Sequence, residues 1–272
     1  MNMKRTGAMR RFLMMLMCCS LLSIAGCRGP SDMHPHEVVT RSIDGLSGED
    51  HFLFKGMTEI RAGEREVLTK RLRFEGQVKH HQGMYMRLIT HPRKENTTTS
   101  RWNPLKLLEE LGEAETTVER VEPTKVLYAL YAQQGTSKKE RGVTEPTFPL
   151  DEAQAYHIQV EGQSAKKIFA SKVWEDYNQI VLPHEKVMAV HDKLSRSDAV
   201  RLEQELNEAE AKHRAELDKL LKGCKVDAEY VLWIDRKSQL PLRLDGKMKV
   251  YYNDKGKSSE TIRTVSEFTR TR

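Results

Sequence analysis

Residues 226–252 read "VDAEYVLWIDRKSQLPLRLDGKMKVYY", and this stretch decides the fold. Its first part, "VDAEYVLWID", alternates as a β-strand does, and "RKSQ" is a turn. From Leu240 to Tyr252 the alternation continues for 13 residues, whereas strands usually have roughly five or six. A strand this long predicts a large curved antiparallel sheet, and Gly246 at its middle is a place where the sheet could bend.

Strand patterns of the same kind occur at both ends of the chain. Apolar residues alternate with more polar ones at 52–60, 72–78 and 84–88, and glycine-containing turns separate these segments. "NDKGK" (253–257) separates the long strand from a last alternating segment, "ETIRTVSEFT" (260–269). This pattern predicts antiparallel hairpins, and we expect further strands at about 118–133 and 155–162.

Four helices are expected between the strands. The first covers residues 35–46, and Asn103 is a good N-cap for the second, "NPLKLLEELG". Ser164 can cap a third that ends near Ile180, and Ser195 or Ser197 a fourth that ends at Gly223. The fourth is expected to cover the sheet or a partner with one narrow apolar stripe, which comprises Leu202, Leu206, Ala209, His213, Leu217, Leu220 and Leu221.

These segments together define the fold class. An open curved sheet must bury its concave face, and the chain supplies three or four half-apolar helices that can do so. We therefore expect an α+β fold, in which a large curved antiparallel sheet, an open half-barrel, is covered by three or four helices. Residues 35–272 are expected to form a single domain, although their number also permits two.

The N-terminus has the layout of an export signal. Four basic residues precede an uncharged run of 15 residues, Phe12 to Gly26, which is shorter than the roughly 20 that span a membrane. The sequence "IAGC" (24–27) resembles the bacterial lipobox, in which diacylglycerol alkylates the cysteine thiol before the signal is cleaved. The alternative is an ordinary signal peptide with a chance cysteine.

The lipobox resemblance implies a lipoprotein signal peptide at 1–26, lipidation of Cys27 and a tether at 27–34. Two acyl chains give stable anchoring, so we expect an extracytoplasmic protein held on the cell membrane by its N-terminal lipid. Removal of residues 1–26 lowers the formal charge from +6 to +2, which leaves little reason to expect nucleic-acid binding. Cys224, the other cysteine of the cleaved chain, is expected to be buried at a strand start, with pairing between molecules or a reactive thiol as the alternatives.

The chain also resembles the LolA-like superfamily of bacterial lipoprotein-fold proteins over most of residues 35–272. The resemblance rests on the order of the lipobox, "FKGMTEI" (54–60), "WNPLKLLEEL" (102–111) and "YVLWIDRKSQLPLRL" (230–244). It implies an incomplete antiparallel barrel around helices, with a gap that can hold lipid acyl chains. Some Gram-positive members are thought to serve in envelope or spore assembly by binding protein partners.

A cleft between sheet and helices, lined by apolar side chains, would be a natural acyl-chain site. Gly246 and Met248 are candidate ligand-binding residues, because glycine leaves space and methionine adapts to irregular tails. Trp102 and Trp174 are further candidates, because each lies on or beside a covering helix. Trp233 lies on a strand with two apolar faces, which fits either a core strand or cover by a ligand, partner or tail.

The sequence offers no catalytic or metal-binding motif. It contains no Gly-x-Ser-x-Gly elbow, phosphate-binding glycine loop or dinucleotide fingerprint. "HPHE" (34–37) and "HH" (80–81) have no cysteine pair nearby, and "HEKVMAVH" (184–191) fails the spacing that places two ligands on one helical face. We therefore expect a protein that is not an enzyme, with no catalytic residues, no metal site and no cofactor.

Two functions fit these expectations. The first is a lipid-anchored cell-envelope protein that binds an apolar ligand, a lipid acyl chain above all, in the cleft. The second is a non-catalytic envelope or sporulation protein that binds a protein partner with the same fold. An apolar cleft on the concave face favours the first function, and an exposed apolar edge or patch outside a filled cleft favours the second.

Replacing Cys27 by serine tests the anchor. The variant is expected to remain an uncut, unlipidated precursor, because sulfur is the nucleophile that accepts the lipid. Mass spectrometry of the membrane fraction measures both changes. Normal cleavage of the Cys27→Ser chain, with membrane attachment by a route other than the signal, would contradict the prediction.

Overall fold

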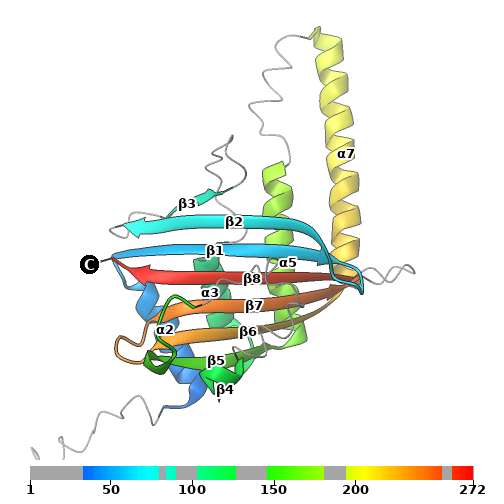
Figure 1. Ribbon diagram of the computed structural model, residues 1–272. Helices are drawn as coiled ribbons and strands as arrows, with labels where there is room; N and C mark the ends of the chain where they lie inside the picture. Colours follow the sequence, from blue (N-terminus) through cyan, green and yellow to red (C-terminus); the bar gives the residue numbers. More distant parts are fainter. Residues whose placement is uncertain are drawn as a thin grey trace, which may run out of the picture. The chain divides into compact units, whose positions relative to one another are not determined.

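The computed structural model describes residues 33–79, 84–89, 103–126, 146–180, 194–252 and 259–271. Residues Pro35–Arg272 form the larger of the chain's two units. All described strands of the larger unit belong to one antiparallel sheet in the order β3-β2-β1-β8-β7-β6-β5-β4. The expected α+β class with a large curved sheet is therefore confirmed (Figure 1). The strands are β1 (His51–Ala62), β2 (Val67–Lys79), β3 (Met84–Leu88), β4 (Thr116–Val121), β5 (Ala153–Val160), β6 (Lys225–Asp235), β7 (Pro241–Tyr251) and β8 (Ser259–Arg270).

The centre of the sheet joins the two ends of the chain. β1 pairs with β8 from Phe52, opposite Arg270, to Ala62, opposite Glu260. The hydroxyl oxygens of Thr58 and Thr264 lie 3.3 Å apart in this pair, and both side chains are buried. The N-terminal hairpins and the C-terminal meander thereby become one layer.

Three helices pack on one side of the sheet, and we call this side the inner face (Figure 1). They are α2 (Pro35–Ser47), α3 (Pro104–Glu113) and α5 (Gly162–Ile180). Their buried apolar residues recur every three or four positions, as Val39, Ile43 and Leu46 do in α2. In α3 the buried leucines are Leu107, Leu108 and Leu111.

Two of the expected caps are confirmed and one is wrong. The Asn103 side chain accepts a hydrogen bond from the Leu105 amide at 2.9 Å, and Ser195 caps α7 (Arg196–Gly223) by accepting from the Asp198 amide at 3.3 Å. In α5 the Glu161 carboxylate accepts from the Gln163 and Ser164 amides instead. The carboxylate of Glu161 reaches these first-turn donors, whereas the Ser164 hydroxyl accepts from Glu115.

Glycines of the inner face each lie opposite an aromatic ring on the next strand. The pairs are Gly56 with Phe74, Gly76 with Phe54, and Gly246 with Tyr230. A Cβ atom at any of these glycines would come within 2.6 Å of the partner's ring, so the ring occupies the space that a side chain would need. Gly246 therefore allows the ring of Tyr230 to lie over the strand. The irregularities in strand pairing occur at other positions, Ile60/Arg61 and Trp233/Ile234.

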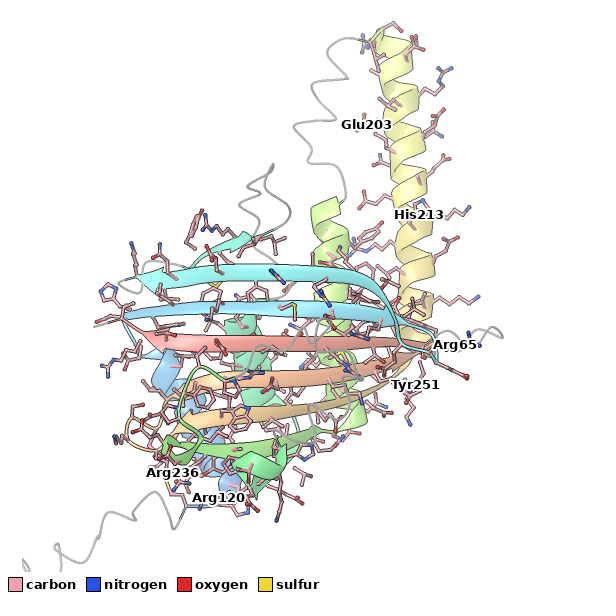
Figure 2. The ribbon with its side chains drawn as sticks, viewed as in Figure 1. Arg65, Arg120, Glu203, His213, Arg236 and Tyr251 are labelled. Atoms are coloured by element: carbon pink, nitrogen blue, oxygen red, sulfur yellow. The ribbon has the colours of Figure 1, made fainter. Side chains whose placement is uncertain are left out.

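The prediction that the apolar stripe of α7 covers the sheet is wrong, because only Leu221 of that stripe is buried. The alternative, that the stripe covers a partner, stays a prediction. Only Ala199 and Leu221 are buried among its described residues, and Leu220 is 46% exposed. Figure 2 shows side chains such as Glu203 and His213 projecting from it on different sides. Its C-terminal part contacts α5, where Tyr177 donates a hydrogen bond to the Glu210 carbonyl at 3.2 Å.

Two neighbouring leucines of α7 test this arrangement. Leu221→Ala should lower the free energy of unfolding by about 2–5 kcal/mol, because it leaves a cavity beside the start of β6. Leu220→Ala should change it by less than about 0.5 kcal/mol, because Leu220 is half exposed. Urea denaturation measures both values, and equal losses would mean that α7 packs on the body along a different side.

Candidate functional site: a hollow on the outer face of the sheet

The predicted ligand residues Gly246 and Met248 lie together on the inner face, beside a small cavity. The cavity has a volume of about 20 Å³ and is also bordered by Leu107, Lys172, Tyr230, Ile262 and Thr264. A volume of this size holds about one water molecule and no acyl chain. The ring of Tyr230 fills the space over Gly246 that we had expected a ligand to use.

Polar groups border the same cavity. Lys172 on α5 is 5% exposed, and its Nζ atom forms an ion pair at 3.3 Å with Oε2 of Glu110 on α3. Burial lowers the pKa of Lys172, although Glu110 opposes this shift. Burial also raises the pKa of Tyr230, and the nearby Glu110 carboxylate adds to the increase. An ammonium group and a hydroxyl beside so small a space suit a water molecule better than a hydrocarbon tail.

The structure separates Trp174 from this pair. Its ring stacks edge-on against Tyr177 with 5.6 Å between centroids, and the Arg214 guanidinium of α7 lies 5.3 Å from the ring centre. Trp174 thus belongs to the contact between α5 and α7. Trp102 and Cys27 lie outside the described residues.

The opposite side of the sheet, which we call the outer face, is covered at one end by the chain itself. Trp233 is fully buried, and the ring of Phe148 packs on it with centroids 5.8 Å apart. Ala153, Ala155 and Val231 complete this cluster, and Leu150 packs against it. Of the two alternatives for Trp233, the structure shows the two-sided core strand.

A row of charged residues of alternating sign crosses the outer face next to this cluster. Register places Trp233 on β6 beside Arg243, and the row then continues through Glu267, Lys55, Glu75 and Arg87 on the next four strands. Cross-strand neighbours on one face lie close enough for opposite charges to interact. Lys55 pairs with Glu267 at 3.2 Å, and Arg87 pairs with Glu75.

The end of this row that lies on β7 and β8 is buried. Arg243 is fully buried and donates hydrogen bonds to both carboxylate oxygens of Asp245, the shortest at 2.7 Å, and to Glu267 Oε1 at 3.3 Å. The indole of Trp233 donates to Asp245 Oδ2 at 2.8 Å. These bonds join the apolar cluster to the charged row, and they supply partners for charges that burial would otherwise make costly.

The other end of the row, on β1, β2 and β3, borders a hollow of about 490 Å³, which we call the outer hollow. It lies over strands β8, β1, β2 and β3. Leu53 and Tyr85, which are 42% and 50% exposed, supply apolar surface, and Lys55 and Arg87 supply charge. Its other lining residues are Phe54, Glu75, Gly76, Gln77, Glu267 and Thr269.

Reasoning from sequence alone missed the outer hollow because its residues occupy the polar positions of alternating strands. Alternation alone predicts that those positions lie on the solvent-exposed face of each hairpin. The spacing of Arg243 and Asp245, two residues apart on one strand, was a usable signal of a charged cluster on that face. Their proximity to Lys55 depends on the pairing of β1 with β8, which no local pattern indicates.

The described part of the chain contains neither a helix that could span a membrane nor a cluster of metal-binding side chains. No described helix combines the length and the apolar composition that crossing a membrane requires. Nowhere in residues 33–79, 84–89, 103–126, 146–180, 194–252 and 259–271 do three or more His, Cys, Asp or Glu side chains come together as a possible metal site.

The chain matches no protein-family model and no curated protein sequence. Among solved structures it is similar to a DUF1329 family protein from Desulfovibrio piger, at 10% identity. This likeness covers 86% of the chain and 90% of that protein, with a TM-score of 0.19, which supports no conclusion about fold or function. Membership of the LolA-like superfamily therefore stays a prediction.

Arg243→Met tests the buried end of the row. The substitution leaves the carboxylates of Asp245 and Glu267 without their guanidinium, so the free energy of unfolding should fall by about 3–5 kcal/mol. Lys55→Met is the control, because Lys55 is 60% exposed at its side chain and should contribute less than about 1 kcal/mol. Chemical denaturation with equal losses for the two variants would contradict the assignment.

Proposed function

We propose that this chain is a non-catalytic, lipid-anchored protein of the cell envelope that binds a polypeptide partner through the outer hollow. The observation that carries the proposal is an exposed surface of mixed apolar and charged side chains beside an edge strand, on the face opposite to α2, α3 and α5. Exposed apolar residues that cluster, as Leu53 and Tyr85 do here, are typical of protein interaction sites.

The composition of the outer hollow also supports a polypeptide as the ligand. Protein interfaces combine aromatic and aliphatic anchors with a polar rim, and arginine and tyrosine are enriched in them. Tyr85 and Leu53 can act as anchors, and the ion pairs of Lys55 and Arg87 can form the rim. The lipid on Cys27, which we infer from the lipobox, would keep this surface at the membrane.

Binding of a lipid acyl chain is the second candidate, and one observation favours it. The inner face beneath β1, β2 and β8 carries buried aromatic residues, Phe52, Phe54, Phe74 and Phe268. These residues form an apolar surface of the kind that hydrocarbon tails contact. The cavity of about 20 Å³ at Gly246 and Met248 is the reason for placing this candidate second.

Photo-crosslinking in intact cells tests the proposal. A benzophenone amino acid in place of Tyr85 should crosslink one defined protein, because this position lies in the outer hollow. The crosslink should be lost when Leu53→Ser is added, because the substitution removes the neighbouring apolar anchor. Immunoblotting of the anchored protein measures both results.

Val67 gives the matched control for this experiment. It is 61% exposed and apolar but begins β2 outside the outer hollow, so the same benzophenone at Val67 should not produce the crosslink. A product of equal size from both positions, or none from Tyr85, would contradict the proposal. Native mass spectrometry that finds lipid bound to the folded chain, together with no crosslink, would favour the second candidate.

A further inference from the structure

Glu267 is a buried carboxylate at the border of the outer hollow. Its side chain is 4% exposed, and its Oε1 atom accepts a hydrogen bond from Arg243 at 3.3 Å. Its Oε2 atom is buried and accepts no hydrogen bond from a described residue, although Lys55 Nζ lies 3.2 Å away as an ion-pair partner. Because a buried charged oxygen is stabilised by a well-aligned donor, this atom is favourably placed to accept a hydrogen bond from a ligand that replaces Lys55.

The Lys55 ammonium group can be displaced from Glu267 Oε2 at little cost. Its side chain is 60% exposed, and ion pairs with so exposed a partner contribute little to stability. The register places Glu75 opposite Lys55 on β2, just as it places Glu267 opposite Lys55 on β8. The ammonium group therefore has a second carboxylate within reach when another cation takes Glu267.

The span of the outer hollow matches the length of a short extended segment. Its lining reaches from Glu267 on β8 to Tyr85 on β3, which are three strand spacings apart. Three spacings amount to about 14 Å, the length of about four residues in an extended conformation. Leu53 on β1 lies between the two ends.

We propose that the outer hollow recognises an extended polypeptide segment by a lysine or arginine side chain, which displaces Lys55 and donates to Glu267 Oε2. An apolar side chain about four residues away in the segment packs against Tyr85 and Leu53. This inference rests on the proposed function and adds the chemistry that selects the partner. A charge-assisted hydrogen bond in a nearly buried position supplies the specificity.

A peptide array tests this chemistry. The probe is an array of random octapeptides, incubated with the full chain purified in detergent. Bound sequences should be enriched in lysine or arginine, with an apolar or aromatic residue three to five positions away. In the best-binding peptide, replacing the basic residue by alanine should weaken binding at least about tenfold.

Three variants of the protein, each checked for folding by circular dichroism, place the effect at Glu267. Glu267→Gln should weaken the selected peptide at least about tenfold, because the charged acceptor is lost. Lys55→Ala should strengthen it severalfold, because the peptide no longer has to displace an ammonium group. Glu59→Gln is the matched control and should leave peptide affinity unchanged.

Glu59 suits this purpose because it is 6% exposed on the same outer face but does not line the outer hollow. Its two oxygens already accept hydrogen bonds from Arg71 and Arg61, at 2.8 and 2.9 Å. Burial acts to raise the pKa of Glu59, but these arginines outweigh it and hold the pKa below its usual value.

The outcomes distinguish this inference from the proposed function. Peptides selected without a basic residue, or selected for acidic residues that pair with Lys55 and Arg87, would overturn the inference even if Leu53→Ser abolished the crosslink from position 85. An array without binders would also overturn it. If Glu267→Gln does not fold, two other measurements still test the inference: binding of the alanine-substituted peptide to the unaltered protein, and binding of the selected peptide to Lys55→Ala. Unchanged affinity in both would contradict the displacement of Lys55.

Discussion

Strand β1 lies near the start of the larger unit and pairs from Phe52 to Ala62 with β8, the last of the described strands. Each of these strands has its other partner nearby in sequence, β2 for β1 and β7 for β8. Without the central pairing, the sheet would divide into a three-stranded piece and a five-stranded piece. A three-stranded sheet is close to the smallest that is stable in water, so the N-terminal hairpins depend on β8.

The same pairing creates the charged row. Lys55 and Glu267 are adjacent only because β1 and β8 are adjacent, and Glu267 in turn contacts the buried Arg243. The outer face therefore has three parts in succession: the apolar cluster at Trp233, the buried ions at Arg243, and the outer hollow. Asp245 connects the first two parts, because it accepts hydrogen bonds from both Trp233 and Arg243.

Local patterns in the sequence predicted much of the fold. The strand predicted from Leu240 to Tyr252, the N-cap at Asn103 and the helix predicted at 35–46 each depend on residues a few positions apart, and all three are confirmed. What sequence alone could not indicate depends on register between distant strands. Gly246 looked like space for a ligand, but Tyr230, its partner across the β6–β7 pair, fills that space.

The prediction that α7 covers the sheet was wrong for a related reason. Its apolar stripe satisfied the helical period, but periodicity does not show what, if anything, lies opposite. The structure places Leu221 against the body and leaves Leu220 half exposed, although the two residues are neighbours. Numerous ion pairs within the helix, such as Lys222 with Asp218 and Arg201 with Glu205, accompany its exposed surface.

The position of β8 also bears on the order in which the polypeptide becomes ordered during synthesis. The hairpin of β1 and β2 can form early, but the edge of β1 that will become the middle of the sheet stays unpaired until β8 has been synthesised. Thr58 and Thr264, whose hydroxyls meet across this edge, are 206 positions apart in sequence. Pairings between such distant residues form slowly, because the intervening loop must first lose entropy. A nascent chain thus carries an unpaired strand edge for most of its elongation, and unpaired edges promote aggregation unless another molecule shields them.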